Sequence, residues 1–104
     1  MEKSAHILGL GYQSVVKVPV DKNKKMDMQA LKQLVEKDIQ DGNIPFLAVA
    51  TIGTTDFGSI DNVKEMSELC KKHNMWLHAD AAYGSGVILS EEYKHRLEGI
   101  NLCD

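Results

Sequence analysis

The stretch at residues 45–52 reads PFLAVATI, a short and almost unbroken apolar run that ends at Gly53. A run of this length and composition is typical of a strand that is buried on both faces of a parallel sheet. A second short apolar segment, MWLHA, follows at residues 75–79. The sequence therefore predicts two buried strands of one sheet.

The segment between these strands has the pattern of an amphipathic helix. Over residues 61–73 apolar side chains recur at helical spacing on one face, at Val63, Met66, Leu69 and Cys70. Asp61 or Ser59 is placed to cap the start, and Asn74 suits the left-handed conformation that ends many helices. A strand, a helix and a strand of these lengths form a βαβ unit with parallel strands and a right-handed crossover. The predicted fold class is α/β.

Two further elements are predicted before this unit. Apolar side chains at helical spacing from residue 28 predict another amphipathic helix, capped by Asp27 and ended by Gly42. Valine-rich residues 14–20 suit a strand, and Pro19 would place that strand at a sheet edge or at a strand end. Both elements fit the same α/β class.

The two ends of the chain carry weaker signals. Residues 1–8 resemble the tail of a helix, which Gly9 or Gly11 would end. Residues 91–97 suit a short helix, and residues 101–104 suit the start of another strand. No repeat, low-complexity stretch or linker divides the chain, so residues 1–104 are expected to form one partial domain.

Composition and charge exclude several classes of partner. Hydrophobic residues make up 43% of the chain and charged residues 26%, which is ordinary for a folded domain. The net charge is −3 and the lysines are spread along the chain, so no basic patch is present for nucleic acid or an anionic membrane. No apolar run is long enough to span a membrane, and residues 1–4 lack the apolar core of a signal peptide. We expect a cytoplasmic protein.

The two cysteines, Cys70 and Cys103, lie far apart in the sequence. Their spacing suits neither a disulfide framework nor a zinc site. We expect both to be reduced core thiols.

Chemistry-bearing side chains stand where the two predicted strands end. In open parallel sheets ligands bind beyond the carboxyl ends of the strands, and Thr51 and Asp80 both fall at that end. Neighbouring strands lie about 4.8 Å apart, so one ligand can contact both side chains. A carboxylate that closes an apolar strand is usually kept by a cation, a metal or hydrogen-bond donors.

Small residues follow Asp80, at Ala81, Ala82, Gly84 and Gly86. They are expected to leave room for a flat ligand against the backbone. Together with the carboxylate, this pattern indicates a planar ligand that carries a positively charged nitrogen.

Simpler interpretations of the same residues stay open. Asp80 can cap the turn that follows it, and Thr51 can serve only as a β-branched strand residue. His78 shares the face of Asp80, because side chains two apart on a strand point the same way. Two ligands are too few for a zinc site, so a structural histidine is favoured over a metal ligand. The glycines form neither of the two common nucleotide-binding loops.

Longer motifs carry a resemblance to a known family. They are PFLAVATIGTT at residues 45–55, then Gly58 and Asp61, and WLHADAAYG at residues 76–84. These motifs resemble those of the group II pyridoxal-phosphate-dependent decarboxylases, which include the aromatic-amino-acid, glutamate and diaminobutyrate decarboxylases. The resemblance runs along the whole chain. It implies the central part of the large domain of a fold-type-I enzyme, in which a mostly parallel sheet lies between two layers of helices.

By position, the resemblance implies a site for pyridoxal 5'-phosphate. Asp80 matches the aspartate that pairs with the pyridine nitrogen, Thr51 the threonine near the phenolic edge, and Ala82 the small residue on one ring face. A carboxylate at the nitrogen favours the protonated ring, which is the better electron sink when carbon dioxide departs. The reaction implied is the α-decarboxylation of an amino acid by a parent enzyme that is expected to be a homodimer.

The branch of the family and the missing parts of the site also follow from the resemblance. The segments LGLG and GTTxxGxxD, at residues 8–11 and 53–61, favour the diaminobutyrate or glutamate branch. The histidine that stacks on the second ring face would lie upstream of Met1, and the Schiff-base lysine would follow Asp104. Neither His6 nor Lys94 stands in the corresponding context.

We therefore expect no catalytic residue and no metal site in this chain. We also expect no turnover by the chain alone, because covalent catalysis through an imine needs an amine.

Two rival functions are kept at this point. An aminotransferase or desulfurase-like enzyme also places an aspartate after an apolar strand, although the long motif at residues 76–84 favours a decarboxylase. A non-catalytic α/β interaction module is the other rival. Two strands that are apolar on both faces have few helices to cover them, so we also expect the isolated chain to associate.

Overall fold

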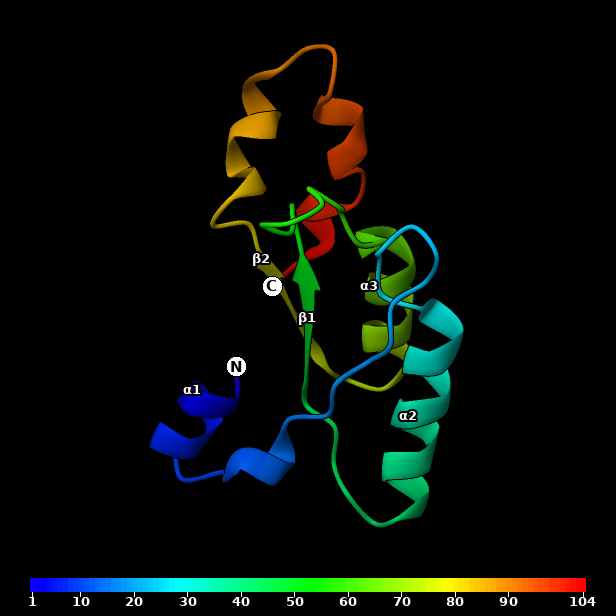
Figure 1. Ribbon diagram of the computed structural model, residues 1–104. Helices are drawn as coiled ribbons and strands as arrows, with labels where there is room; N and C mark the ends of the chain where they lie inside the picture. The colour runs from blue at the N-terminus through cyan, green and yellow to red at the C-terminus, as the bar shows by residue number, and fades with distance from the viewer.

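The protein is described over residues 1–104 by a computed structural model (Figure 1). In chain order its helices and strands are α1 (Glu2–Ile7), α2 (Met28–Gln40), β1 (Leu47–Thr51), α3 (Val63–Lys72) and β2 (Trp76–Asp80). Short 3₁₀ helices cover Tyr12–Ser14, Gly84–Leu89, Lys94–Leu97 and Ile100–Leu102. None of the helices has the length and apolar character needed to cross a membrane.

The strands β1 and β2 form a parallel pair joined through α3, which confirms the predicted βαβ unit and the α/β class. The register sets Leu47 opposite Trp76 and Thr51 opposite Asp80. Helices α2 and α3 lie side by side on one side of the pair, whereas α1 lies on the other side (Figure 1). The carboxyl ends of both strands therefore meet at one end of the sheet.

The hydrophobic core lies between the strand pair and the two longer helices. Ala50 of β1 and Ile52, which directly follows β1, are fully buried in it beside Leu77 of β2. Met66 of α3 and Leu31 of α2 complete it, as their helical spacing predicts. Burying an aliphatic side chain of this size is worth about 1.5–3 kcal/mol, so this single covered face supplies much of the driving force for folding.

The opposite face of the strand pair is largely open, so the prediction of strands buried on both faces is wrong for this chain. Leu47 is 41% exposed and Trp76 is 65% exposed, although both lie in strands. Apolar composition shows that a strand can be buried, but not that a second layer of helices is present to cover it. Only the six-residue helix α1 lies on that side (Figure 1).

The first two helices end as their sequences predict. The carboxylate of Asp27 caps α2 by accepting the N–H groups of Gln29 at 2.9 Å and Ala30 at 3.0 Å. Gly42 follows the last turn with φ +85°, a conformation that glycine adopts without steric cost. Gly9 has φ +79° just after α1, as predicted for the end of that helix.

The start of α3 differs from its prediction. Asn62 is the capping residue, because its side chain accepts the N–H of Glu65 at 3.2 Å. Asp61 and Ser59, the two predicted caps, are engaged in other contacts. At the far end, Asn74 has φ +54° and confirms the predicted left-handed residue.

Residues 14–20 do not form the predicted strand. Val20 makes only one isolated antiparallel bridge, to Met26, and the carbonyl of Pro19 accepts the N–H of Asp27 at 2.9 Å. The valine content suits a strand, but no neighbouring strand lies beside the segment to complete a ladder. Local propensity is therefore outweighed by the missing partner.

The last part of the chain is more tightly wound than predicted. Residues 91–97 contain a 3₁₀ helix only at Lys94–Leu97, and residues 101–104 begin inside the 3₁₀ helix Ile100–Leu102 in place of a strand. Asp104 nevertheless contacts β2, since its N–H donates to the Leu77 carbonyl at 3.1 Å and its carboxylate accepts the Leu77 N–H at 2.9 Å. These two hydrogen bonds hold Asp104 against the strand pair.

Candidate functional site

The candidate site lies at the carboxyl ends of β1 and β2, where Thr51 and Asp80 face each other in register. Both residues are half-buried. They belong to the open face of the strand pair, because the alternate positions of β1, from Ala48 to Ile52, are buried against the helices. The structure thus brings together the two residues that the sequence pattern singled out.

Asp80 keeps most of its hydrogen-bonding capacity free. Its Oδ1 atom accepts the N–H of Ala82 at a long 3.3 Å, so the carboxylate does serve the following turn, as one of the simpler interpretations holds. Its Oδ2 atom accepts no hydrogen bond within the chain, and the hydroxyl of Thr51 has no partner either. A carboxylate oxygen and a hydroxyl are therefore both available to a ligand at this end of the sheet.

Ala82 and Gly84 occupy different surroundings from the first pair. Ala82 is exposed on the loop after β2. Its backbone N–H donates a hydrogen bond to Asp80, and this is its only connection to the site. Gly84 is buried, and a Cβ atom there would lie 2.1 Å from the Ile52 carbonyl oxygen. The expectation that Gly84 makes room for a flat ligand is thus wrong, because the space at Gly84 is filled by the backbone of β1.

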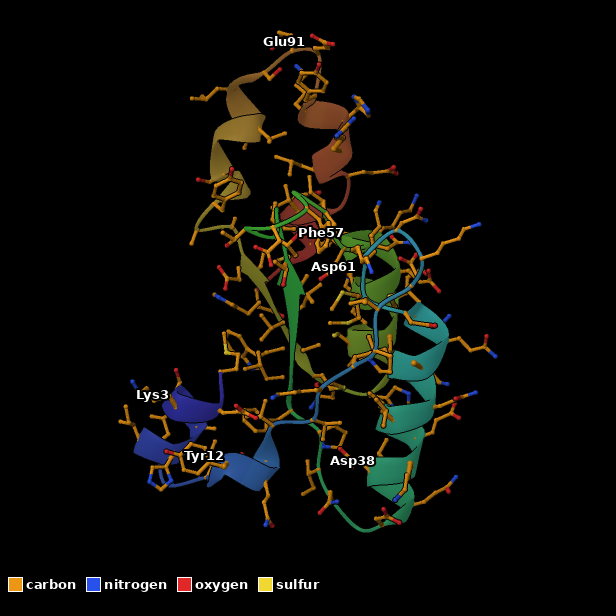
Figure 2. All side chains as sticks on the ribbon, viewed as in Figure 1. Lys3, Tyr12, Asp38, Phe57, Asp61 and Glu91 are labelled. Atoms are coloured by element: carbon orange, nitrogen blue, oxygen red, sulfur yellow. The ribbon has the colours of Figure 1, made fainter.

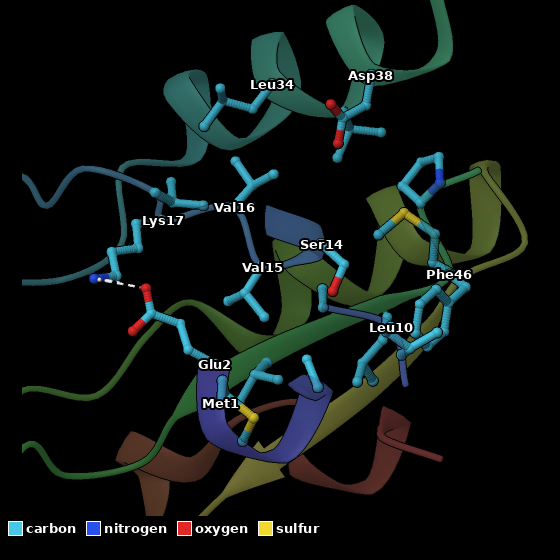
Figure 3. Close-up of a pocket in the computed structure, with 18 of the residues that line it drawn as sticks. Met1, Glu2, Leu10, Ser14, Val15, Val16, Lys17, Leu34, Asp38 and Phe46 are labelled. Atoms are coloured by element: carbon cyan, nitrogen blue, oxygen red, sulfur yellow. Dashed lines mark ion pairs between the residues drawn. The ribbon is translucent and has the colours of Figure 1, made fainter. Parts of the chain in front are cut away.

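A groove with a volume of about 780 Å³ runs along the open face and reaches both Thr51 and Asp80 (Figure 3). This volume is within the usual range for small-molecule sites. The groove is mainly apolar, with walls from α1, from residues 13–18, and from the Leu34 side of α2. One ion pair lies in the groove and joins Lys17 to Glu2 at 3.0 Å. The charge of Lys17 is therefore already balanced by a carboxylate.

Asp61 does not cap α3, as its sequence position predicts, but has a different role near the site. Its side chain is only 8% exposed, and it lies between the end of β1 and the start of α3 (Figure 2). One carboxylate oxygen accepts the Thr51 N–H at 2.8 Å, and the other accepts the Met26 N–H at 2.7 Å. The available signal was its setting between apolar Ile60 and Val63, since a carboxylate there must find donors.

The remaining reactive side chains lie away from these residues or lack activation. His78 is exposed on β2, and no group of three or more His, Cys, Asp and Glu side chains could hold a metal ion. Cys70 and Cys103 are free thiols, and burial together with nearby Asp104 raises the pKa of each. A raised pKa keeps a thiol protonated at neutral pH, so neither cysteine is an activated nucleophile.

Comparison with known proteins places the whole chain in one group. Residues 1–104 match the family model of the pyridoxal-dependent decarboxylase conserved domain. The chain is 41% identical over its full length to an L-2,4-diaminobutyrate decarboxylase of Acinetobacter baumannii, of which it covers 20%. It is 39% identical to the cysteine sulfinic acid decarboxylase of Homo sapiens, of which it covers 21%.

Solved structures share the fold. Mouse CSAD superposes with a TM-score of 0.96 at 38% identity, over 99% of this chain and 22% of that one. The glutamate decarboxylase domain of a Vibrio parahaemolyticus protein gives a TM-score of 0.93 at 39% identity, over 98% and 22% of the two chains. The chain thus spans about a fifth of the length of the curated relatives that it matches.

Proposed function

The chain belongs to the pyridoxal-dependent decarboxylase family, and from that premise we propose that it forms the cofactor-binding middle of an amino-acid decarboxylase. The observation that carries this proposal is the pairing of Thr51 with Asp80 at the open end of the strand pair. Each offers a polar atom without a partner in the chain. This donor and acceptor set fits a flat ring that has a basic nitrogen at one edge and an oxygen at another.

Asp80 binds the ring nitrogen in this proposal. A carboxylate beside a pyridine nitrogen favours the protonated form, because the opposite charges attract. A hydrogen bond between charged groups is worth about 1.5–3 kcal/mol in net terms. When it is bound, pyridoxal phosphate supplies a protonated ring that accepts the electron pair left by departing carbon dioxide.

Thr51 and Ala82 set the position of the ring. The free hydroxyl of Thr51 stands one strand away from Asp80, where it can hydrogen bond to the oxygen at the phenolic edge. Ala82 carries only a methyl group and is exposed, so a ring can lie against it without a steric clash. The apolar walls of the groove exclude water around such a ring and strengthen its polar contacts.

The amine for covalent chemistry comes, in this proposal, from outside residues 1–104. Lys17 is the lysine that lines the groove, but it is paired with Glu2 and its side chain is 78% exposed. Lys94 is paired with Glu91 on the loop beyond β2. An activated lysine nucleophile is usually desolvated or set beside another cation, which is true of neither side chain. The chain alone is therefore expected not to turn over substrate.

The wider assignment follows the relatives. The names of these relatives describe decarboxylation of diaminobutyrate and of cysteine sulfinic acid, so the proposed substrate is an amino acid, with the diaminobutyrate or glutamate branch favoured. We place residues 1–104 in the large domain of a fold-type-I enzyme that is cytoplasmic and homodimeric. Sedimentation of the full protein that carries this chain tests the dimer.

The decisive experiment is a titration of the full protein with pyridoxal phosphate, followed by absorbance. We expect Asp80→Ala to weaken binding about 10- to 100-fold, which is the loss of a charge-assisted hydrogen bond. The matched control is Glu68→Gln, which removes an exposed carboxylate on the outside of α3. Equal affinity in wild type and Asp80→Ala would refute the proposed site.

A second measurement separates the reaction types. The full protein with cofactor is incubated with amino acids, and both carbon dioxide and keto acid are assayed. Carbon dioxide with the matching amine supports decarboxylation. Keto acid without carbon dioxide would instead assign the protein to amino-group transfer.

A further inference from the structure

At the level of the candidate site, the outer edge of β1 is paired only by an isolated antiparallel bridge between Ile52 and Ile60. The Ile52 N–H donates to the Asp80 carbonyl and the Trp76 N–H donates to the Phe46 carbonyl, both at 2.8 Å. The even-numbered residues of β1 therefore point their backbone groups toward β2. Because successive residues in a strand alternate, the N–H and C=O of Thr51 point to the opposite edge, away from β2.

Asp61 satisfies both of these backbone groups. The Thr51 N–H donates to Oδ2 of Asp61 at 2.8 Å, and the Asp61 N–H donates to the Thr51 carbonyl at 3.0 Å. One residue thus provides the donor and the acceptor that a third strand would provide. The exchange holds the last residue of β1 just before Gly53, which has φ +86° and turns the chain out of the sheet.

The other oxygen of Asp61 ties a distant segment to the same place. Its Oδ1 atom accepts the Met26 N–H at 2.7 Å, from a residue 35 positions earlier. Both partners of the carboxylate are N–H donors, and the side chain is almost wholly buried. The side chain at position 61 must therefore accept a hydrogen bond at each of its two terminal atoms. An amide has only one acceptor oxygen, so its NH₂ group would face one of the two N–H donors.

We propose that Asp61 is a positioning residue for the cofactor site and acts through Thr51. By holding both backbone groups of Thr51, it fixes where the Thr51 hydroxyl stands relative to the Asp80 carboxylate. This inference rests on the proposed function, since it assigns a role toward the same ring. Asp61 itself does not line the groove that carries the ligand, whereas its two hydrogen-bond partners, Thr51 and Met26, do.

The test uses the full protein and compares two quantities for each variant: the melting temperature without cofactor and the dissociation constant for pyridoxal phosphate. We expect Asp61→Asn to raise the dissociation constant about tenfold, because one buried N–H loses its acceptor and the end of β1 shifts. The matched control is Leu69→Ala, a buried site on α3 that does not line the groove. It lowers the melting temperature but leaves the dissociation constant unchanged.

A double-mutant cycle tests the route through Thr51. In the Thr51→Val background the hydroxyl is absent, so Asp61→Asn should weaken binding by less than about threefold. A full tenfold loss in that background would overturn the route. So would a dissociation constant for Asp61→Asn equal to that of wild type, or a loss in Leu69→Ala as large as in Asp61→Asn.

Two further outcomes keep the inference separate from its premise. If the protein does not bind pyridoxal phosphate, or if Asp80→Ala binds as well as wild type, the proposed function itself fails.

If Asp61→Asn does not fold, Asp61→Glu provides a second variant, which retains both acceptor oxygens on a longer side chain. We expect Asp61→Glu to fold and to bind several-fold more weakly than wild type, and equal binding would overturn the positioning role.

Discussion

Gly84 has the least freedom to change of the residues around the site. A Cβ atom there would lie 2.1 Å from the Ile52 carbonyl oxygen and 2.7 Å from the carbonyl carbon. Both are backbone atoms at the end of β1, so they cannot rotate aside as a flexible side chain can. The glycine thus allows the loop after β2 to lie directly on the end of β1 and closes that side of the site.

We expect Gly84→Ala to lower the free energy of unfolding by about 3 kcal/mol, the upper end of the usual cost of overpacking. Denaturant unfolding of the two proteins measures this difference. Gly86→Ala provides the control in the same 3₁₀ helix, because a Cβ there meets nothing within 4 Å. Small and equal effects at both positions would show that the loop is not held against β1.

Individual residues also show how far sequence reasoning reaches. Thr51 and Asp80 were placed together correctly, because the ends of parallel strands must meet. The role of Asp61 could not be predicted, because Asp61 and Asn62 are both good capping residues and are adjacent in the sequence. What separates them is the Met26 N–H, which comes from 35 residues earlier and which no local pattern reveals.

At the level of elements, burial and pairing decide which predictions hold. The run at residues 45–52 forms β1 because β2 lies beside it and α3 covers it. Residues 14–20 are richer in valine but have no strand beside them, and they form no strand, only one isolated bridge. The prediction of two-sided burial failed for a related reason, since cover on the second face depends on elements that the run itself does not encode.

The two longer helices allow a comparison of their caps. Asp27 accepts two N–H groups at 2.9 and 3.0 Å, whereas Asn62 accepts one at 3.2 Å. We therefore expect Asp27→Ala to lower the free energy of unfolding by about 1–2 kcal/mol, and Asn62→Ala by about 0.5–1 kcal/mol. Urea unfolding of both variants measures the order. The reverse order would mean that the shorter bonds at α2 do not control helix stability.

On the scale of the whole molecule, the open face of the strand pair is the main apolar surface that no other element covers. Leu47 and Trp76 are exposed within the strands, and Leu8, which lines the same groove as Leu47, is exposed just after α1. Exposed apolar side chains that gather on one face often mark an interface. In the proposed parent enzyme, other parts of the protein would cover it.

We expect the isolated chain to associate through this face. Sedimentation over a range of concentrations should show species larger than a monomer, and the emission of Trp76, the sole tryptophan, should shift to the blue as they form. Leu47→Gln should weaken the association. Ile39→Gln serves as the control, because it removes an exposed apolar side chain of α2 outside the open face. A strictly monomeric chain at all concentrations would contradict this expectation.

The direct connection of β1 to β2 through α3 also has a kinetic meaning. Thr51, Asp61 and Asp80 all belong to one βαβ unit, which is a single continuous segment of the chain. Contacts between residues close in sequence form faster than distant ones, because less chain entropy is lost in closing the loop. During synthesis, the paired ends of β1 and β2 can thus reach their native geometry as soon as β2 has emerged from the ribosome.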